Sequence, residues 1–460
     1  MDYNFRINWL NIVFNFEFQS YLDIELLKEI SLTSKLAREK LKPLVFKNLR
    51  LSKYNFDWGA NNIVSSYYSY ANGDQIKVTR SKSSKISNVN KILNNIAEDL
   101  KDAKKFSQSL HIEELSRPGV LLFPVVGLFD SLTVLKCNDC DIPFIKFIKL
   151  GELIPSLTNI SLSNVNLTKL KAENFSPKQY TFPPNLIHLN ITDCCVISSN
   201  LLLDPYEYLY NNDNSQRTSN CFALPEVSIP NLKKLTFCCN KKKNKGLKKF
   251  LELHPNLDSL TLGSFNFKLV NNLGALKNLQ ITKMSSFKDN IEYLKLDSIK
   301  KLGFFDIQVS DYANIKKLCT LCPNLEYLNV VIYSTNDYQN AIDGFLGSLV
   351  SNLSKLRTLK FKLLTYQIHT NNYGRNMVVM NTAENLDINK ISNVEELIVV
   401  ANGSAILNIK FENCSKLKRL RLESNNIRVD GDDFRQKFEN YGSWAFKFNG
   451  YSINGYNLLK

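Results

Sequence analysis

The sequence predicts a solenoid, in which similar supersecondary units stack one on the next instead of surrounding one globular core. A short apolar frame recurs along most of the chain, and the tripeptide Pro-Asn-Leu opens several of its copies. The frame has an apolar residue, two free positions, a second apolar residue, one free position and a third apolar residue, as in Leu325, Leu328 and Val330. Repetition of this kind is typical of stacked units.

Eleven copies of the frame occur, and most start 19 to 31 residues apart. Because each unit of a solenoid packs only on its neighbours, a chain of 460 residues can fold without one oversized core. The other ten copies are Leu132/Leu135/Cys137, Leu157/Ile160/Leu162, Leu186/Leu189/Ile191, Leu232/Leu235/Phe237, Leu257/Leu260/Leu262, Leu276/Leu279/Ile281, Leu302/Phe305/Ile307, Leu356/Leu359/Phe361, Val394/Leu397/Val399 and Leu417/Leu420/Leu422.

Two further features lie in register with the frame. Pro-Asn-Leu begins at Pro184, Pro230, Pro255 and Pro323, where proline ends a preceding helix and favours an extended start to a strand. The ninth position holds Cys140, Cys194, Asn240, Asn402 and Asn425. The whole pattern resembles the leucine-rich repeat, which implies an α/β solenoid with a curved parallel sheet and outer helices. We expect these repeats over residues 119–425.

The first 51 residues have a different pattern, because their apolar residues recur every three or four positions, as in short amphipathic helices. The segments SLTSK and PLVFKNLRL resemble the second half of an F-box, although the Leu-Pro-x-Glu opening of that family is replaced by RINWLN. The resemblance implies that the segment binds a Skp-type adaptor, which joins a cullin and a RING ubiquitin ligase. The adaptor-contacting positions that it implies are Ile7, Leu10, Val13, Phe14, Leu22 and Leu26. Alternatively, these residues only cap the solenoid edge.

The remaining segments complete the expected organisation. Residues 52–118 read as irregular N-terminal repeats with an insertion, including a helical stretch over Ile86–Lys105 and a short strand over Leu110–Ile112. Asp204–Ser219 is rich in Asn, Tyr and Ser, and we expect a surface loop there. Residues 426–460 are expected to form a C-terminal cap, with a helix over Asp430–Glu439 and a strand over Ser443–Phe448.

Composition favours a soluble protein of the cytoplasm or nucleus. The first residues lack the apolar block of a signal peptide, and the longest apolar run, Gly119–Phe129, is shorter than the ~20 residues of a membrane span. The ten cysteines include two CxxC pairs, but several of them occupy inward repeat positions, where a small thiol packs well. We therefore expect buried reduced thiols and no metal site. The formal charge of +15 permits an acidic partner.

Residues that flank the later apolar positions of each copy should form the concave sheet face, since side chains alternate along a strand. The early rows are rich in Ser, Thr and Asn. An apolar step follows, made by Phe304, Tyr327 and Val331, and then a basic patch of Lys360, Lys362, Arg419 and Arg421. Aromatic residues commonly anchor interfaces. These residues predict a protein substrate with an acidic or phosphorylated segment.

Motifs of enzymes are missing from the sequence, which contains no Gly-rich phosphate loop, HExxH or nucleophile elbow. The four histidines are scattered, and only His188 is expected on the concave face. We therefore expect no catalytic residues and no cofactor. Nucleic-acid binding is poorly supported, because the basic cluster at Lys241 has no interleaved aromatics. Two alternatives to a ligase subunit stay open, a scaffold without a ubiquitin-ligase role and a basic solenoid that docks on an anionic surface such as chromatin.

Overall fold

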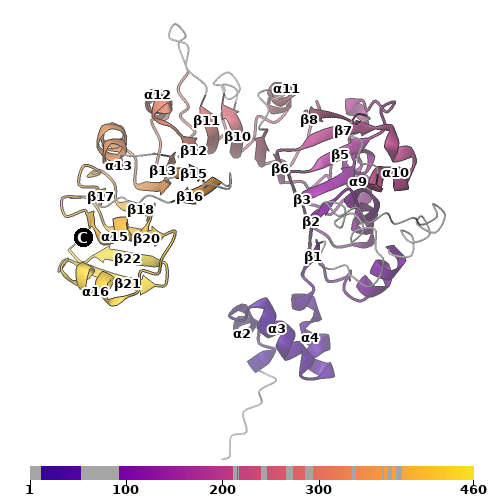
Figure 1. Ribbon diagram of the computed structural model, residues 1–460, viewed down its shortest axis with the longest axis horizontal. Helices are drawn as coiled ribbons and strands as arrows, with labels where there is room; N and C mark the ends of the chain where they lie inside the picture. The colour runs from indigo at the N-terminus through magenta and orange to yellow at the C-terminus, as the bar shows by residue number, and fades with distance from the viewer. Residues whose placement is uncertain are drawn as a thin grey trace, which may run out of the picture. The chain divides into compact units, whose positions relative to one another are not determined.

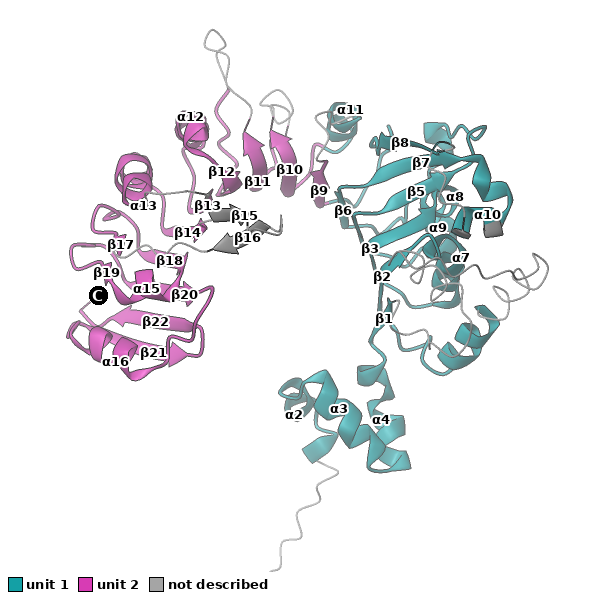
Figure 2. Ribbon diagram, viewed as in Figure 1, with its two compact units in different colours: residues 1–232, 245–254 teal, residues 233–244, 255–460 magenta. Residues whose placement is uncertain are grey.

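The computed structural model (Figure 1) divides into two compact units, which Figure 2 draws in different colours and which we call unit 1 and unit 2. Unit 1 comprises residues 1–232 and 245–254, and unit 2 comprises residues 233–244 and 255–460. The structure describes residues 12–52, 93–210, 215, 217–239, 246–265, 273–284, 294–333, 338–364, 367–370, 376–379 and 386–459.

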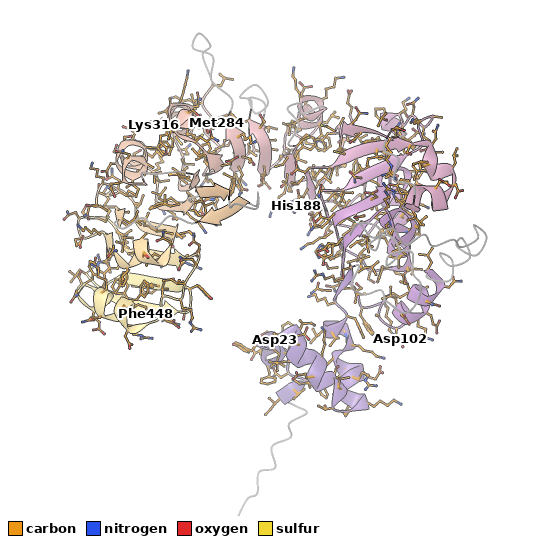
Figure 3. The ribbon with its side chains drawn as sticks, viewed as in Figure 1. Asp23, Asp102, His188, Met284, Lys316 and Phe448 are labelled. Carbon is orange, nitrogen blue, oxygen red and sulfur yellow. The ribbon has the colours of Figure 1, made fainter. Side chains whose placement is uncertain are left out.

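Near the start of the described residues, unit 1 contains the short helices α2 (Phe16–Ser20), α3 (Ile24–Leu32) and α4 (Lys35–Val45). Side-chain oxygens cap their first turns. Asp23, labelled in Figure 3, accepts a hydrogen bond from the Leu26 N–H at 2.8 Å, and Ser34 accepts one from the Ala37 N–H at 3.0 Å. The chain then enters β1 (Asn48–Ser52), so the predicted amphipathic helices are present and lead directly into the first strand.

Five parallel strands form the main ladder of unit 1, in the order β1, β2 (Ser109–Ser116), β3 (Val134–Pro143), β4 (Asn159–Ser163) and β6 (His188–Thr192). Leu135, Ile160 and Leu189 lie opposite one another and are buried, as the repeat frame predicts. The ladder also contains a copy that the apolar frame missed. Its strand is β2, and its first position is the buried polar residue Ser107.

A second ladder runs along unit 1 and consists of the end of β3, β5 (Asn166–Lys169), β7 (Cys195–Ser199) and the antiparallel strand β8 (Arg217–Cys221). The chain turns between the two ladders at Asp139, Asn164 and Asp193, with φ values of 51°, 51° and 53°. Asp and Asn tolerate this left-handed conformation better than other non-glycine residues. The following ninth position is then directed inward, and Cys140 and Cys194 are buried there.

The segment expected as a surface loop over Asp204–Ser219 is instead structured in part, and that prediction was wrong. It contains α10 (Pro205–Tyr210) and the first residues of β8. The buried Tyr208 hydroxyl donates to Asp141 Oδ2 at 2.6 Å, and Asn166 Nδ2 donates to Asp141 Oδ1 at 2.7 Å. Polar composition concealed this buried network, because a carboxylate inside the protein requires donors that only the folded chain brings together.

Short helices connect the strands of unit 1. The buried His254 follows α11 (Leu247–Glu252), the last of these helices. Its Nε2 accepts a hydrogen bond from the Ile229 N–H at 2.8 Å, and its Nδ1 lies 2.6 Å from the Phe250 carbonyl oxygen. This pair of contacts fits the neutral imidazole with its proton on Nδ1. The connecting helices are α7 (Gly119–Leu122), η3 (Phe123–Leu128), α8 (Phe144–Ile148), α9 (Leu150–Leu153), η4 (Pro177–Gln179), η5 (Asn200–Leu203) and α11 (Leu247–Glu252).

Unit 2 contains a parallel ladder in which each strand pairs with the next one named. The strands are β9 (Lys234–Cys238), β10 (Ser259–Phe265), β11 (Asn278–Met284), β12 (Lys301–Ile307), β13 (Tyr327–Tyr333), β14 (Thr358–Leu364), β18 (Glu396–Ala401) and β20 (Arg419–Ser424). Asn324 of a Pro-Asn-Leu start donates from Nδ2 to the carbonyl oxygen of Asp297 at 2.8 Å. This bond ties one repeat to the previous one.

Helices and short strands fill the connections of unit 2. Buried Ile315 and Leu318 pack α12 against the repeats, whereas Lys316, labelled in Figure 3, is half-buried on that helix. The connecting elements are η8 (Val309–Asp311), α12 (Tyr312–Thr320), α13 (Tyr338–Asn340), η9 (a π-helix, Ala341–Gly347), α14 (Ser348–Ser351), β15 (Gln367–Thr370), β16 (Asn376–Val379), β17 (Leu386–Asp387), α15 (Gly403–Leu407) and β19 (Ile409–Lys410).

Ten of the eleven predicted copies have their three frame residues buried in the predicted register, and the copy in β12 is wrong. In this strand Leu302 lies opposite Leu279 and Leu328, and Phe304 lies opposite Ile281 and Val330. The true frame is therefore Ile299/Leu302/Phe304, and all three residues are buried. Two apolar frames overlap in this part of the sequence. The strand register shifts between Phe304 and Ile307, so Ile307 is buried as well although it does not belong to the true frame.

Unit 2 ends in α16 (Asp432–Glu439) and an antiparallel hairpin, β21 (Trp444–Asn449) and β22 (Ser452–Asn457). β22 pairs antiparallel with β20 and so covers the last edge of the ladder. Phe446 lies against Phe438, with ring centroids 4.9 Å apart, and Phe448 (Figure 3) lies 6.4 Å from the same ring. This aromatic cluster packs the hairpin against α16.

All ten cysteines are free thiols. Cys319 and Cys322 are buried, and burial raises the pKa of Cys322 to about 12. Cys194 is equally buried and donates to the Leu162 carbonyl oxygen at 3.6 Å. These thiols pack as small apolar groups. Within the described ranges, no helix combines the length and the apolar character needed to cross a membrane.

Candidate functional site

The exposed sheet face of unit 2 is the surface on which most of the predicted substrate-contacting residues lie. Strand register places Tyr327 in one row with Thr358, Glu396 and Arg419. The next row contains Asn329, Lys360, Ile398 and Arg421, and a third contains Val331, Lys362, Val400 and Glu423. We call these three rows the unit 2 face. Their neighbours along each strand, such as Leu359 and Phe361, are buried, and Val400 is the one member of these rows that is buried as well.

Phe304 does not belong to this face, and the prediction that it contacts substrate was wrong. It is 1% exposed and takes the inward position of β12. Phe305 lies on the other side of the strand, where a Cβ added at Gly303 would come within 3.6 Å of its ring. The half-buried Phe305 is therefore the aromatic residue that β12 presents on its exposed side.

Tyr327 and Val331 flank Asn329 on β13, and all three are half-buried. Burial raises the pKa of Tyr327, and the nearby carboxylates of Glu396 and Glu423 raise it further. The phenol is therefore neutral at physiological pH and can donate a hydrogen bond.

The predicted basic patch is interleaved with carboxylates. Glu423 lies 2.7 Å from Arg421 Nε and 3.8 Å from Lys360 Nζ, and Thr358 donates to Glu396 at 3.1 Å. Lys362 and Arg419 have no ion-pair partner among the residues that the structure describes. An acidic group arriving at this face would therefore meet unpaired positive charge as well as cations held in position by Glu423.

The sheet face of unit 1 is mainly polar and makes many of its own hydrogen bonds. Asn190 donates to Ser161 Oγ at 2.9 Å, and Thr192 donates to Asn190 Oδ1 at 2.9 Å. His188 on β6, labelled in Figure 3, is the histidine that the sequence predicted on this face. It lies opposite Asn159 of β4. Hydroxyl and amide groups that satisfy one another offer less to a partner than unpaired groups do.

The unit 1 face also carries a charged cluster that the sequence did not predict. The buried carboxylate of Glu113 contacts Arg50 Nε and lies 3.4 Å from His111 Nε2. Burial lowers the pKa of His111, and the charges of Lys136 and Arg50 lower it further. The cluster was missed because Arg50 and Glu113 come from β1 and β2, which residues 53–108 separate in the sequence. Only the β1–β2 pairing brings them together.

The helical segment α2–α4 exposes many large apolar side chains. Of the predicted adaptor-contacting residues, Leu26 is exposed, Val13, Phe14 and Leu22 are half-buried, and Ile7 and Leu10 lie outside the described residues. The exposed set is larger than the predicted one. It comprises Phe16, Phe18, Tyr21, Ile24, Leu26, Leu32 and Leu36, which we call the helical apolar set. Tyr21 is 86% exposed and Leu32 70%.

Within the described part of the chain, no three His, Cys, Asp or Glu side chains converge as metal ligands. The sites that the structure does present are two polar or charged sheet faces and one apolar helical surface. Such surfaces can hold protein partners by burial and charge.

No protein-family model and no curated protein matches this sequence. Two of the solved structures that are similar to this chain share 14% identity with it. The TLR13–ssRNA13 complex matches over 74% of this chain and 50% of its own, with a TM-score of 0.30. The leucine-rich-repeat domain of APL1B matches over 70% of this chain and 76% of its own, with a TM-score of 0.24. This chain thus spans half the length of the TLR13 chain, and neither likeness bears on function.

The evidence for the fold is the regular repetition of buried residues along the paired strands. One buried residue from each repeat occupies the same inward place in consecutive parallel strands, and the frame recurs in both units. The described repeats therefore form an α/β solenoid of parallel strands with the predicted leucine-rich-repeat pattern.

Proposed function

We propose that this protein is the substrate-recognition subunit of a cullin–RING ubiquitin ligase, acting in the cytoplasm or nucleus. Its helical segment would bind a Skp-type adaptor, and its repeats would hold a substrate protein. The protein would contribute positioning, because holding substrate lysines near the transfer machinery raises their effective concentration there.

The observation that carries the proposal is the helical apolar set. Tyr21 and Leu32 are largely exposed, and five more large apolar residues of the same short segment are exposed with them. The interior of α3 and α4 is small by comparison, with Leu27, Ala37 and Leu41 buried. Exposed apolar residues gathered on one segment mark a binding surface, whereas isolated ones are ordinary.

A cap on the solenoid edge would use its apolar residues differently. A cap is expected to bury its apolar side against the first repeat, since covering that edge is its purpose. Leu32 and Leu36 are 70% and 49% exposed, although they adjoin the junction of α3 and α4. Their exposure supports a partner that is separate from the repeats.

The test is co-purification of a Skp-type adaptor and a cullin with the full-length chain from its native cell. The informative variant is Leu32→Ser with Leu36→Ser, because both side chains are exposed and their replacement should leave the fold intact. A matched control is Leu458→Ser with Leu459→Ser, which removes two leucines that are 66% and 80% exposed at the other end of the chain. Circular dichroism verifies that all forms are folded.

We expect adaptor and cullin with the unaltered chain and with the control, and a loss of both with the α3–α4 variant. If a folded, unaltered chain brings down neither protein, the ligase role is refuted. The chain would then be better described by the second candidate, a leucine-rich-repeat scaffold, which the polar and charged sheet faces also support.

A further inference from the structure

The C-terminal hairpin continues the unit 2 face beyond the last repeat. Tyr456 on β22 lies opposite Arg419, and Asn454 lies opposite Arg421. On β21, Lys447 lies opposite Asn454. Paired residues of antiparallel strands share a face, so the row of Lys360 and Arg421 extends to Lys447. The hairpin therefore adds side chains to this face as well as covering a sheet edge.

Packing on the opposite side of the hairpin, together with one backbone hydrogen bond, holds this part of the face in place. Gly455 and Ile453 alternate with the presented residues and are buried. A Cβ at Gly455 would come within 2.5 Å of the Phe446 ring, so only glycine permits that ring to lie on the strand. The Asn457 N–H donates to the Lys418 carbonyl oxygen at 3.0 Å, which fixes the end of β22 to the repeat.

Three cations of the second row have a regular spacing. Lys360, Arg421 and Lys447 lie on alternate strands of the sheet, because β18 separates the first two and β22 separates the last two. Neighbouring strands are about 4.8 Å apart, so successive cations are about 10 Å apart. An extended polyproline II segment repeats its side-chain direction every three residues, over about 9.3 Å. The two spacings agree.

We propose that the unit 2 face, with its C-terminal hairpin, binds an extended acidic protein segment whose carboxylates recur every third residue and lie over Lys360, Arg421 and Lys447. This inference rests on the proposed function in that the segment would belong to the substrate. Arg421 uses Nε to contact Glu423, and a guanidinium carries further N–H donors that could reach an incoming carboxylate.

The charges of the face favour a carboxylate segment over a nucleic acid. Five cations, Lys360, Lys362, Arg419, Arg421 and Lys447, lie among two carboxylates, Glu396 and Glu423. A continuous line of phosphates would pass over those two carboxylates and be repelled by them. A segment with spaced acidic residues can place uncharged residues there. Tyr456, which is 50% exposed, offers a ring beside Arg419 on which such residues can pack.

The test uses fluorescence anisotropy with the purified full-length chain and two fluorescein-labelled peptides of identical composition. One carries glutamate at every third position in a proline-rich background, and the other has its glutamates in one block. The protein variants are Lys447→Glu, on the hairpin, and the matched control Lys410→Glu, an exposed lysine on β19 in a different sheet. Both variants change the net charge equally.

We expect the spaced peptide to bind more tightly than the blocked one, and Lys447→Glu to weaken its binding roughly fivefold while Lys410→Glu leaves it unchanged. Equal binding of the two peptides would refute the spacing. Equal effects of the two variants would refute the role of the hairpin. A fluorescein-labelled single-stranded oligonucleotide is measured in the same assay, and tighter binding of it than of the spaced peptide would overturn the acidic protein partner. Co-purification of the adaptor is measured separately, so the ligase role can fail without affecting these outcomes.

Discussion

Replacing Phe304 by alanine should destabilise unit 2 by about 4 kcal/mol. A phenylalanine side chain buries roughly 150 Å² of apolar surface, and each Å² contributes about 25 cal/mol. Phe304 is 1% exposed, so nearly all of that contribution would be lost. The result lies within the ~3–5 kcal/mol typical of buried phenylalanine truncations. Phe305→Ala is the matched control, and it should cost only about 1 kcal/mol because Phe305 is half-buried.

The assay is urea unfolding of the full-length chain followed by far-ultraviolet circular dichroism. The midpoint of the unit 2 transition should fall much further for Phe304→Ala than for Phe305→Ala. The opposite order would refute the register of β12 and would restore the sequence-based frame Leu302/Phe305/Ile307. It would also return Phe304 to the exposed side of the sheet, as the sequence predicted.

Three further outcomes follow from the packing. Tyr208→Phe removes the hydroxyl donor to Asp141 and should destabilise unit 1 by about 1–3 kcal/mol in urea unfolding; an unchanged midpoint would contradict the network. Gly455→Ala places a Cβ against the Phe446 ring and should cost unit 2 about 1–3 kcal/mol, with faster proteolysis near the C-terminus; unchanged stability and proteolysis would contradict the close approach. Burial lowers the pKa of His254, so the unfolded chain takes up a proton first. Stability should be full above about pH 6.5 and decline below it, and His254→Gln should reduce that decline in urea midpoints measured across the pH series.

In the helical segment α2–α4, the sequence pattern predicted the helices but not which of their residues are buried. The three- and four-residue spacing correctly predicted short helices before the first strand, because an amphipathic helix must place its apolar residues on one side. The pattern could not separate the residues that those helices bury from those that they expose. Leu26 and Leu27 both fit the helical spacing, yet Leu27 is 7% exposed and Leu26 is 45% exposed. Only the packing of α3 against α4 made that distinction.

The unit 2 face could be predicted from the sequence to the extent that the register of its strands could be predicted. Tyr327, Val331, Lys360 and Arg421 lie on the unit 2 face because alternation along a strand follows directly from the positions of the buried leucines. The prediction failed at Phe304. There two apolar frames overlap within one strand, and pairing with β11 and β13 selected one of them.

The sequence by itself determined the repeat, its strand positions and the placement of most inward residues. Those properties depend on local periodicity and on the residue types at turns, and both can be read from residues that are close in the sequence. The tertiary structure alone decided which distant residues meet. Tyr208 reaches Asp141 across 67 positions of sequence, and Lys447 joins the row of Arg421 through the antiparallel strand β22. Neither contact has a local signal, because each depends on where the chain returns and on which buried groups need partners there.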